Sequence, residues 1–300
     1  MDKSQFSFFD GAIIDSTTIR LIGVEDARAE NGIPHGLIMT RRGDQWLAVG
    51  IGEQLVSCTT TPVPDYTFIA IAESGREVDI GNNAVRQEVV ALGEHSPTSN
   101  GPLTAVRAFA NGQVFCVGTA RQAYRKTGSS SWIRVDQTCK PDDPETRSTT
   151  AFLAVDGFCA EEVYAVGWEG EIWMFDGSGW HQIDSPTNLA LHGLYCAPDG
   201  VVYICGKCGT LLKGRGSVWE VLEQSDTEED LRSVCMFEGV LYVCSTNLVY
   251  RWHDEKKLEV VKMASPVSTT GRLTAAGHRM LSIGLKDVAI FDGQDWHQLV

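Results

Sequence analysis

A short apolar run that ends in a small residue recurs along this chain, and its spacing constrains the fold more than any other feature. The runs are VFCVG (114–118), VYAVG (163–167), VYICG (202–206), LYVCS (241–245) and MLSIG (280–284). Their last residues are 49, 39, 39 and 39 positions apart. A period near forty residues is typical of folds in which one supersecondary unit repeats and buries its faces against its neighbours.

Most of these runs are followed by a second short strand, a glycine turn and a tryptophan. The turn and tryptophan pairs are Gly128 with Trp132, Gly177 with Trp180, Gly216 with Trp219, and Gly293 with Trp296. FDGSGWHQI (175–183) and FDGQDWHQL (291–299) agree at six of nine positions. Glycine supplies the positive φ of a tight hairpin, and tryptophan begins the next strand with a large packing surface. Each unit is therefore predicted to hold four strands.

The repeat predicts an all-β fold, a single β-propeller of seven four-stranded blades over residues 1–300, with six blades as the main alternative. Continuous apolar runs such as VYAV are expected where neighbouring blades cover both faces of a strand. The repeat is clearest in residues 103–300 and divergent in 1–102. There, residues 18–46 and 66–81 can supply two further blades. The ring could close without strand exchange or through residues 4–10.

The segment EVYAVGWEGEIWMFDGSGWHQI (162–183) resembles the repeat of bacterial propellers whose units follow the pattern vyavG-gGtil-ydGssW. This loose group is related by pattern to WD40-like and BNR-type propellers. The resemblance covers residues 111–300 well and 1–110 weakly, and it implies the fold only. The Gly-His and Trp-Asp pairs of WD40 repeats do not recur. The Ser-x-Asp-x-Gly order of Asp-box sialidases is also missing, which argues against a glycosidase.

Composition restricts the partners and the compartment. The formal charge is −14 and the isoelectric point is near 4.9, so the surface should repel phosphate backbones and anionic lipids. We therefore expect no nucleic-acid or membrane partner, and we expect a protein partner with a basic surface. Asp10 and Asp15 interrupt any signal peptide, and an odd number of cysteines, nine, favours free thiols. These features predict a cytoplasmic protein.

The residues that could carry chemistry fit structural positions of the repeat. Cys205 of the CGKC motif occupies a core-strand position, and no second C-x-x-C accompanies Cys208. His181 follows a turn tryptophan and is expected on an outer strand, whereas Asp176 is expected in a turn; His297 and Asp292 repeat this arrangement. Phosphate-loop, GxSxG and HExxH motifs do not occur. The sequence therefore predicts no catalytic residue, no metal, no cofactor and no enzymatic activity.

Binding is expected on one face of the ring. In a propeller, the loops between blades share a face with the loops that join the second and third strands. Acidic residues gather in the segments assigned to this face, and Trp168 could be an aromatic anchor. The predicted partner-binding residues are Glu25, Asp26, Asp142, Asp143, Glu145, Trp168, Glu169, Asp184, Asp226, Glu228, Glu229 and Asp230. Charged loops are ordinarily just solvated, and this simpler interpretation stays open.

Three functions are compatible with these features. The first is a non-catalytic binding protein, most specifically an immunity-type inhibitor that neutralises a cognate toxin or effector through the acidic loop face. The second is a propeller enzyme, a lyase or hydrolase, with its site at the central channel. The third is an assembly scaffold. We expect the chain to be monomeric by itself.

Overall fold

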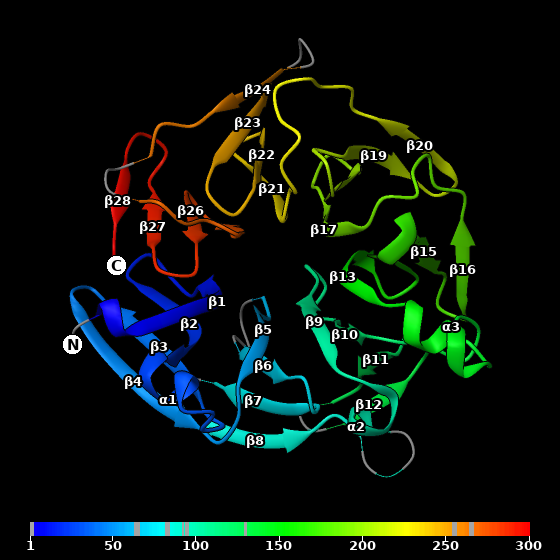
Figure 1. The fold of residues 1–300 in the computed structure, drawn as a ribbon, viewed down its shortest axis with the longest axis horizontal. Coiled ribbons are helices and arrows are strands. Elements are labelled where there is room, and N and C mark those ends of the chain that lie inside the picture. The colour runs from blue at the N-terminus through cyan, green and yellow to red at the C-terminus, as the bar shows by residue number, and fades with distance from the viewer. Residues whose placement is uncertain are drawn as a thin grey trace.

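The structure is a computed structural model that describes residues 3–62, 67–81, 85–91, 93, 96–128, 131–253, 257–263 and 267–300. Seven antiparallel sheets of four strands each stand around one axis (Figure 1). The prediction of seven blades is confirmed, and the six-blade alternative is wrong. Each sheet takes its four strands from one continuous stretch of chain.

The strands of each blade run in chain order from the channel outwards. The first blade holds β1 (Phe6–Ile13), β2 (Thr18–Glu25), β3 (Gly36–Arg42) and β4 (Gln45–Ile51). The second holds β5 (Leu55–Thr60), β6 (Phe68–Ala72), β7 (Arg76–Ile80) and β8 (Val85–Val89). The third holds β9 (Leu103–Ala108), β10 (Val114–Gly118), β11 (Ala123–Lys126) and β12 (Trp132–Arg134). The fourth holds β13 (Phe152–Cys159), β14 (Glu162–Gly167), β15 (Ile172–Phe175) and β16 (Trp180–Ile183).

The remaining blades follow the same order. The fifth holds β17 (Leu191–Cys196), β18 (Val202–Gly206), β19 (Leu211–Arg215) and β20 (Val218–Val221). The sixth holds β21 (Ser233–Phe237), β22 (Val240–Cys244), β23 (Val249–His253) and β24 (Lys257–Val260). The seventh holds β25 (Arg272–Ala276), β26 (Arg279–Ile283), β27 (Val288–Phe291) and β28 (Trp296–Gln298). The second strands β10, β14, β18, β22 and β26 contain the recurring apolar runs.

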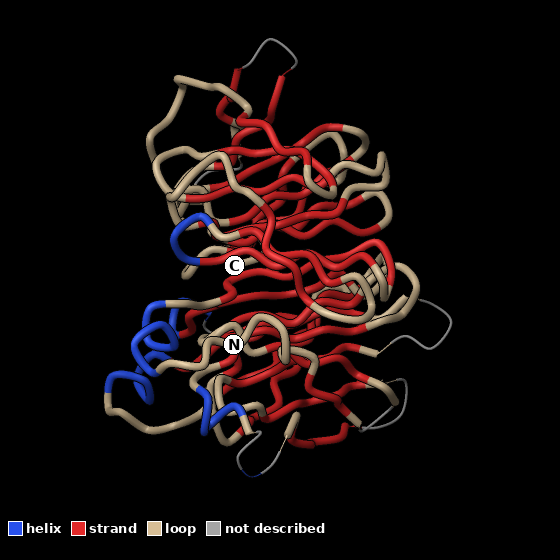
Figure 2. Tube along the Cα trace, turned by 90° about the vertical axis from the view of Figure 1, so that its right-hand side faces the viewer, coloured by secondary structure: helices blue, strands red, loops and turns tan. Residues whose placement is uncertain are grey.

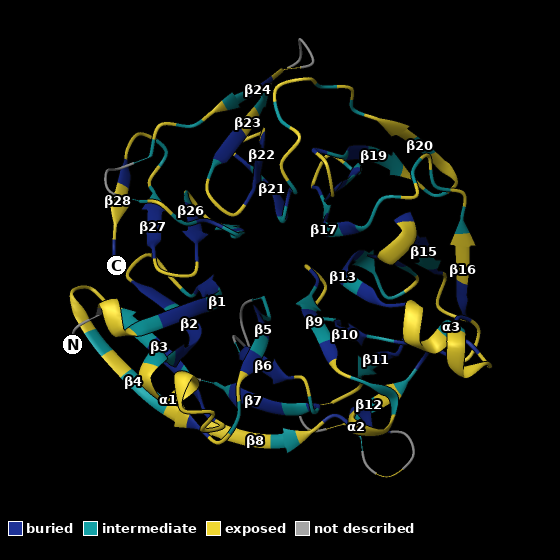
Figure 3. Ribbon diagram, in the orientation of Figure 1, coloured by how far each residue is buried: buried dark blue, intermediate teal, exposed yellow. Residues whose placement is uncertain are grey.

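Burial decreases from the inner strands to the outer ones (Figure 3). In β14, every residue after Glu162 is buried, whereas the residues of β20 are exposed except for half-buried Trp219. The second strand of a blade is covered on both sides by neighbouring blades, so an apolar side chain is favourable at every position and alternation disappears. This packing accounts for the continuous apolar runs in the sequence.

Short helices mark one face of the ring, which we call the helical face (Figure 2). It carries the loops between second and third strands and the loops between consecutive blades. Its helices are α1 (Asp26–Glu30), α2 (Pro97–Asn100), α3 (Pro144–Thr149) and η3 (Trp168–Gly170), and η1 (Lys3–Gln5) precedes β1. The tight hairpins lie on the opposite face. Within the described ranges, no helix has the length and apolar character needed to cross a bilayer.

The ring closes by packing of the seventh blade against the first, without strand exchange. β1 pairs with β2 and packs against β25 and β26. Phe8 lies in one buried apolar cluster with Leu281 and Ile283, and its amide donates to the carbonyl of Leu285 at 3.0 Å. The structure combines the two possibilities that the sequence left open, because no strand is exchanged and residues within 4–10 contact the seventh blade.

Side chains on the innermost strands bind the backbone of the next blade, and we call this set the inner belt. Its carboxylates and hydroxyls accept hydrogen bonds from amides of the following first strand: Asp10 Oδ2 from Cys58 at 3.0 Å, Ser57 Oγ from Val106 at 3.2 Å, Thr59 Oγ1 from Ala108 at 3.0 Å, Asp156 Oδ2 from Cys196 at 2.9 Å and Ser233 Oγ from Leu273 at 3.1 Å. Neighbouring first strands share no backbone ladder, so these bonds satisfy amides that would otherwise be buried without partners.

Four of the five apolar runs end in glycine, and a close backbone approach requires that residue. A Cβ on Gly167 would overlap the carbonyl of Ala151, which lies in the loop that enters the same blade. Gly118 and Gly206 face the carbonyls of Pro102 and Ala190 in the same way. The sequence period therefore records a steric constraint as well as a strand boundary.

We expect Gly167→Ala to lower the free energy of unfolding by on the order of 3 kcal/mol, because backbone must move to admit the methyl group. Gly50→Ala is the matched control, since no atom lies within 4 Å of a Cβ placed there. That variant should stay within about 0.5 kcal/mol of the wild type. Urea unfolding of both variants measures the difference; equal stabilities would contradict the steric explanation.

A charged cluster is buried between the second and third blades. Lys126 Nζ contacts the carboxylate of Glu77 and lies 3.4 Å from Asp79 Oδ2, and Trp132 Nε1 donates to Glu77 at 2.7 Å. One cation thus serves two carboxylates. Burial, together with the hydrogen bond and charge of Glu77, raises the pKa of Asp79 to about 7.

Asp79→Asn should be more stable than the wild type above neutral pH. The pKa of Asp79 is higher in the folded chain than in the unfolded one, so its stabilising protonated form is present below about pH 4 and is lost as the pH rises through about 7. The amide imitates the neutral acid at every pH. We expect a gain of roughly 1–2 kcal/mol at pH 8 that shrinks towards pH 4.

Urea unfolding across this pH range tests the effect. Asp295→Asn, at an exposed position of the opposite face, is the control and should follow the wild type throughout. A pH-independent difference for Asp79→Asn would show that charge burial is not the cause.

Candidate functional site

All predicted partner-binding residues lie on the helical face. Glu25 ends β2 and Asp26 begins α1, while Asp142, Asp143 and Glu145 lie on and before α3. η3 contains Trp168 and Glu169. Asp184 follows β16, and the segment from Asp226 to Asp230 connects β20 to β21. The topology therefore brings residues from four blades to one side of the ring.

Some of these carboxylates are engaged within the chain. Asp26 pairs with Lys286 and accepts from Ser7 Oγ at 2.6 Å, which joins the first and seventh blades. Three others accept from backbone amides: Asp143 from Thr146 at 2.8 Å, Asp226 from Leu258 at 2.8 Å and Asp230 from Cys208 at 3.1 Å. Asp230 also lies 3.5 Å from Arg232 Nη2. The bond from Thr146 lowers the pKa of Asp143. These four acids have structural roles whether or not a partner binds.

The other predicted acids are available to a partner. Asp142, Glu145, Glu169, Asp184, Glu228 and Glu229 are exposed, and Glu25 is half-buried. Within the described part of the chain, their carboxylates have no hydrogen-bond or ion-pair partner. Exposed unpaired carboxylates of one sign give a negative potential that salt screens over about 10 Å.

Trp168 places an aromatic ring among these acids. Its side chain is 37% exposed at the start of η3, immediately after Gly167. Glu169 has a φ of 58° and Gly170 a φ of 73°, so the chain turns sharply here before β15 begins. A half-exposed indole on a short rigid turn offers a partner a large contact area at low entropic cost.

We expect Asp226→Ala to lower the free energy of unfolding by about 1 kcal/mol, because the amide of Leu258 loses its partner. Glu228→Ala, two positions away, removes an exposed carboxylate without a partner and should leave stability unchanged. Thermal unfolding of both variants separates structural acids from available ones. Equal losses would contradict this division.

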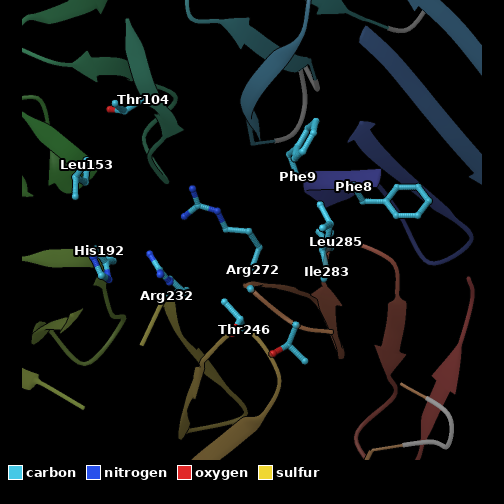
Figure 4. Close-up of a pocket in the computed structure, with 13 residues that line it drawn as sticks. Phe8, Phe9, Thr104, Leu153, His192, Arg232, Thr246, Arg272, Ile283 and Leu285 are labelled. Carbon is cyan, nitrogen blue, oxygen red and sulfur yellow. The ribbon is translucent and has the colours of Figure 1, made fainter. Parts of the chain in front are cut away.

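The central channel opens on the helical face in a cavity of about 380 Å³ that the sequence did not predict (Figure 4). We call it the channel mouth. It is lined by Phe8, Phe9, Thr104, Leu153, His192, Arg232, Thr246, Thr270, Gly271, Arg272, Ile283, Gly284 and Leu285. This described lining contains no carboxylate.

β-Bulges on the first strands supply several of these side chains. In β9, β13 and β17 the pairing with the second strand skips one residue, namely Thr104, Leu153 and His192. A bulged residue is released from the ladder and can turn its side chain away from the blade. Each lies 14 positions before the repeated glycine of its blade, so the repeat contained the signal that locates them.

The channel mouth is positively charged although the rim is acidic. Arg232 and Arg272 extend into it beside His192 (Figure 4). Nδ1 of His192 lies 3.1 Å from the carbonyl of Leu231. Burial lowers the pKa of His192, and the neighbouring charge of Arg232 lowers it further. The permanent charge at neutral pH therefore comes from the two arginines.

The candidates set aside in the sequence have the expected structural positions. Cys205 is buried in β18 and Cys208 is exposed in the following turn. On the opposite face, Asp176 caps a turn and its Oδ2 lies 2.8 Å from His181 Nε2. Asp292 and His297 repeat this pair at 2.8 Å. The core and turn interpretations of these residues are confirmed.

Comparison with known proteins places the chain in a family. No family model matches it. It is 33% identical over 299 residues to the immune protein Tsi7 of Pseudomonas aeruginosa strain PAO1, and the alignment covers 98% of this chain and 97% of that protein. The chain belongs to the family of Tsi7.

Solved structures share the fold at low sequence identity. An inactive virginiamycin B lyase from Staphylococcus aureus has a TM-score of 0.76 at 7% identity, covering 97% of this chain and 96% of its own. The WD40 propeller domain of Doa1 scores 0.73 at 12%, covering 96% and 93%. YCF48 from Cyanidioschyzon merolae scores 0.71 at 12%, covering 96% and 95%. At these identities the likeness shows the propeller fold alone.

Proposed function

We propose that this protein is an immunity protein that binds a cognate toxin and neutralises it through the helical face. The observation that carries the proposal is the identity of 33% to the immune protein Tsi7 over almost the whole of both chains. An alignment of this extent spans all seven blades and the segments that connect them.

The helical face offers what such binding needs. Seven blades hold its loops on rigid strands, so a partner meets a surface that loses little freedom on binding. Trp168 supplies an aromatic contact, and the available acids steer and orient a partner with a basic surface. The absence of nucleic-acid and membrane partners, a monomeric state and a cytoplasmic location stay predictions from the sequence.

We propose binding without catalysis. The fold of the virginiamycin B lyase is similar, but at 7% identity it transfers no chemistry. His192 is the titratable base of the channel mouth, and its Nδ1 faces a backbone carbonyl. No described lining residue there is a carboxylate that could orient it as a general base.

Growth protection and binding test the proposal. The products of the genes that neighbour the gene of this chain are each expressed in bacteria with and without it, and a product that is toxic is purified and titrated with this chain by calorimetry. We expect protection and a tight one-to-one complex. Glu228→Lys with Glu229→Lys should weaken binding by at least about tenfold and reduce its dependence on salt, because two steering carboxylates are reversed.

Glu161→Lys with Asp295→Lys is the matched control. It reverses two exposed acids in hairpins of the opposite face and should bind like the wild type. Failure of the wild-type chain to bind or protect would reject the proposed function. Equal weakening by both double variants would reject the helical face as the contact and leave only a general charge effect.

A further inference from the structure

The channel mouth holds two arginines whose charge no described residue fully neutralises. Arg272 has no hydrogen-bond or ion-pair partner in the described ranges. Arg232 Nη2 lies 3.5 Å from Asp230 Oδ2, and its Nε is buried without an acceptor. Buried donors in proteins are nearly always satisfied, so this group has bonding capacity left for an acceptor.

Two of the threonine hydroxyls of the mouth already have partners. The hydroxyl of Thr104 donates to the carbonyl of Phe152 at 2.6 Å, and that of Thr270 donates to the carbonyl of Ser245 at 2.8 Å. The two guanidinium groups are therefore the permanently charged donors that the mouth offers to an anion. Guanidinium forks match the two oxygens of a carboxylate or phosphate.

Apolar side chains border the same space and strengthen the attraction. Phe9 and Leu285 lie on one side of Arg272, while Arg232 and His192 lie on the other (Figure 4). An apolar wall lowers the local dielectric and makes a charge–charge contact stronger than it would be in open water.

We propose that the channel mouth is an oxyanion-binding site in which Arg272 and Arg232 together hold one carboxylate or phosphate group. The acidic rim repels an extended polyanion, so the ligand is a small anion or a single acidic group on a protein. The site shares the helical face with the proposed toxin contact. Its first test uses this chain alone, so its failure would leave the proposed function untouched.

Calorimetric titration with inorganic phosphate at fixed ionic strength tests the site. We expect saturable binding to the wild type, and Arg272→Gln and Arg232→Gln should each weaken it by at least about tenfold. Arg272→Lys should recover part of the loss, since it keeps the charge and loses the fork. Thermal unfolding of each variant checks that it is folded. Because two glutamine variants are measured independently, the test still stands if one of them fails to fold.

Arg251→Gln is the matched control. Arg251 pairs with Glu259 between β23 and β24, so this variant removes the same charge outside the mouth and should bind phosphate like the wild type. Absence of saturable binding to the wild type would overturn the proposal. So would equal weakening by Arg251→Gln and Arg272→Gln.

A second titration with the toxin identifies the source of the anion. If an acidic group of the partner occupies the mouth, phosphate competes with the toxin and Arg272→Gln weakens the complex. If a free anion is the ligand, neither added phosphate nor Arg272→Gln weakens the complex with the toxin, while phosphate binding still depends on Arg272. Both results support the site.

Discussion

The ring depends on the inner belt, in which side chains on the first strand of one blade form hydrogen bonds with the first strand of the next blade. Backbone ladders hold each blade together, but they end at the blade, so the strands around the channel must be joined by other means. Asp10 and Asp156 do this with carboxylates that accept from the following blade, and Ser57 and Ser233 do it with hydroxyls. Each accepts a hydrogen bond from an amide of the next first strand, which has no ladder partner on that side. These bonds hold neighbouring blades, and with them the loops of the helical face, in place.

Charge on the helical face changes sign from the rim to the axis. Acids such as Glu228 and Asp142 lie on loops between blades, whereas Arg232 and Arg272 line the channel mouth. A surface with a negative rim and a positive centre discriminates partners by arrangement and not by net charge alone. A uniformly basic protein would match the rim and oppose the centre. A family built on this fold can therefore alter specificity through loop residues while the blades stay the same.

The sequence predicted the repeat architecture well because steric and burial constraints act at every period. Gly167 and Trp180 have counterparts in most of the recurring units, because these units need a close backbone approach and a packed outer strand. The divergent first blades were recognised less clearly, and their closure against the seventh was left open. The channel mouth was missed for a physical reason: His192 reaches it through a bulge, and strand alternation alone does not reveal which residue leaves the ladder. Likewise, the sequence shows two acidic residues and does not distinguish Asp226, whose carboxylate accepts from the amide of Leu258, from Glu228, whose carboxylate is free to contact a partner.

The seam, where the seventh blade packs against the first, allows the order of the blades along the chain to be changed. Every blade is one continuous stretch, and the two chain ends lie near each other beside the seam (Figure 1). Joining Val300 to the N-terminus and cutting any loop between blades would therefore preserve all backbone ladders and all inner-belt bonds. Circular permutants of this kind are topologically equivalent to the natural order. Ring proteins assembled this way can place a fused segment at any position around the circumference.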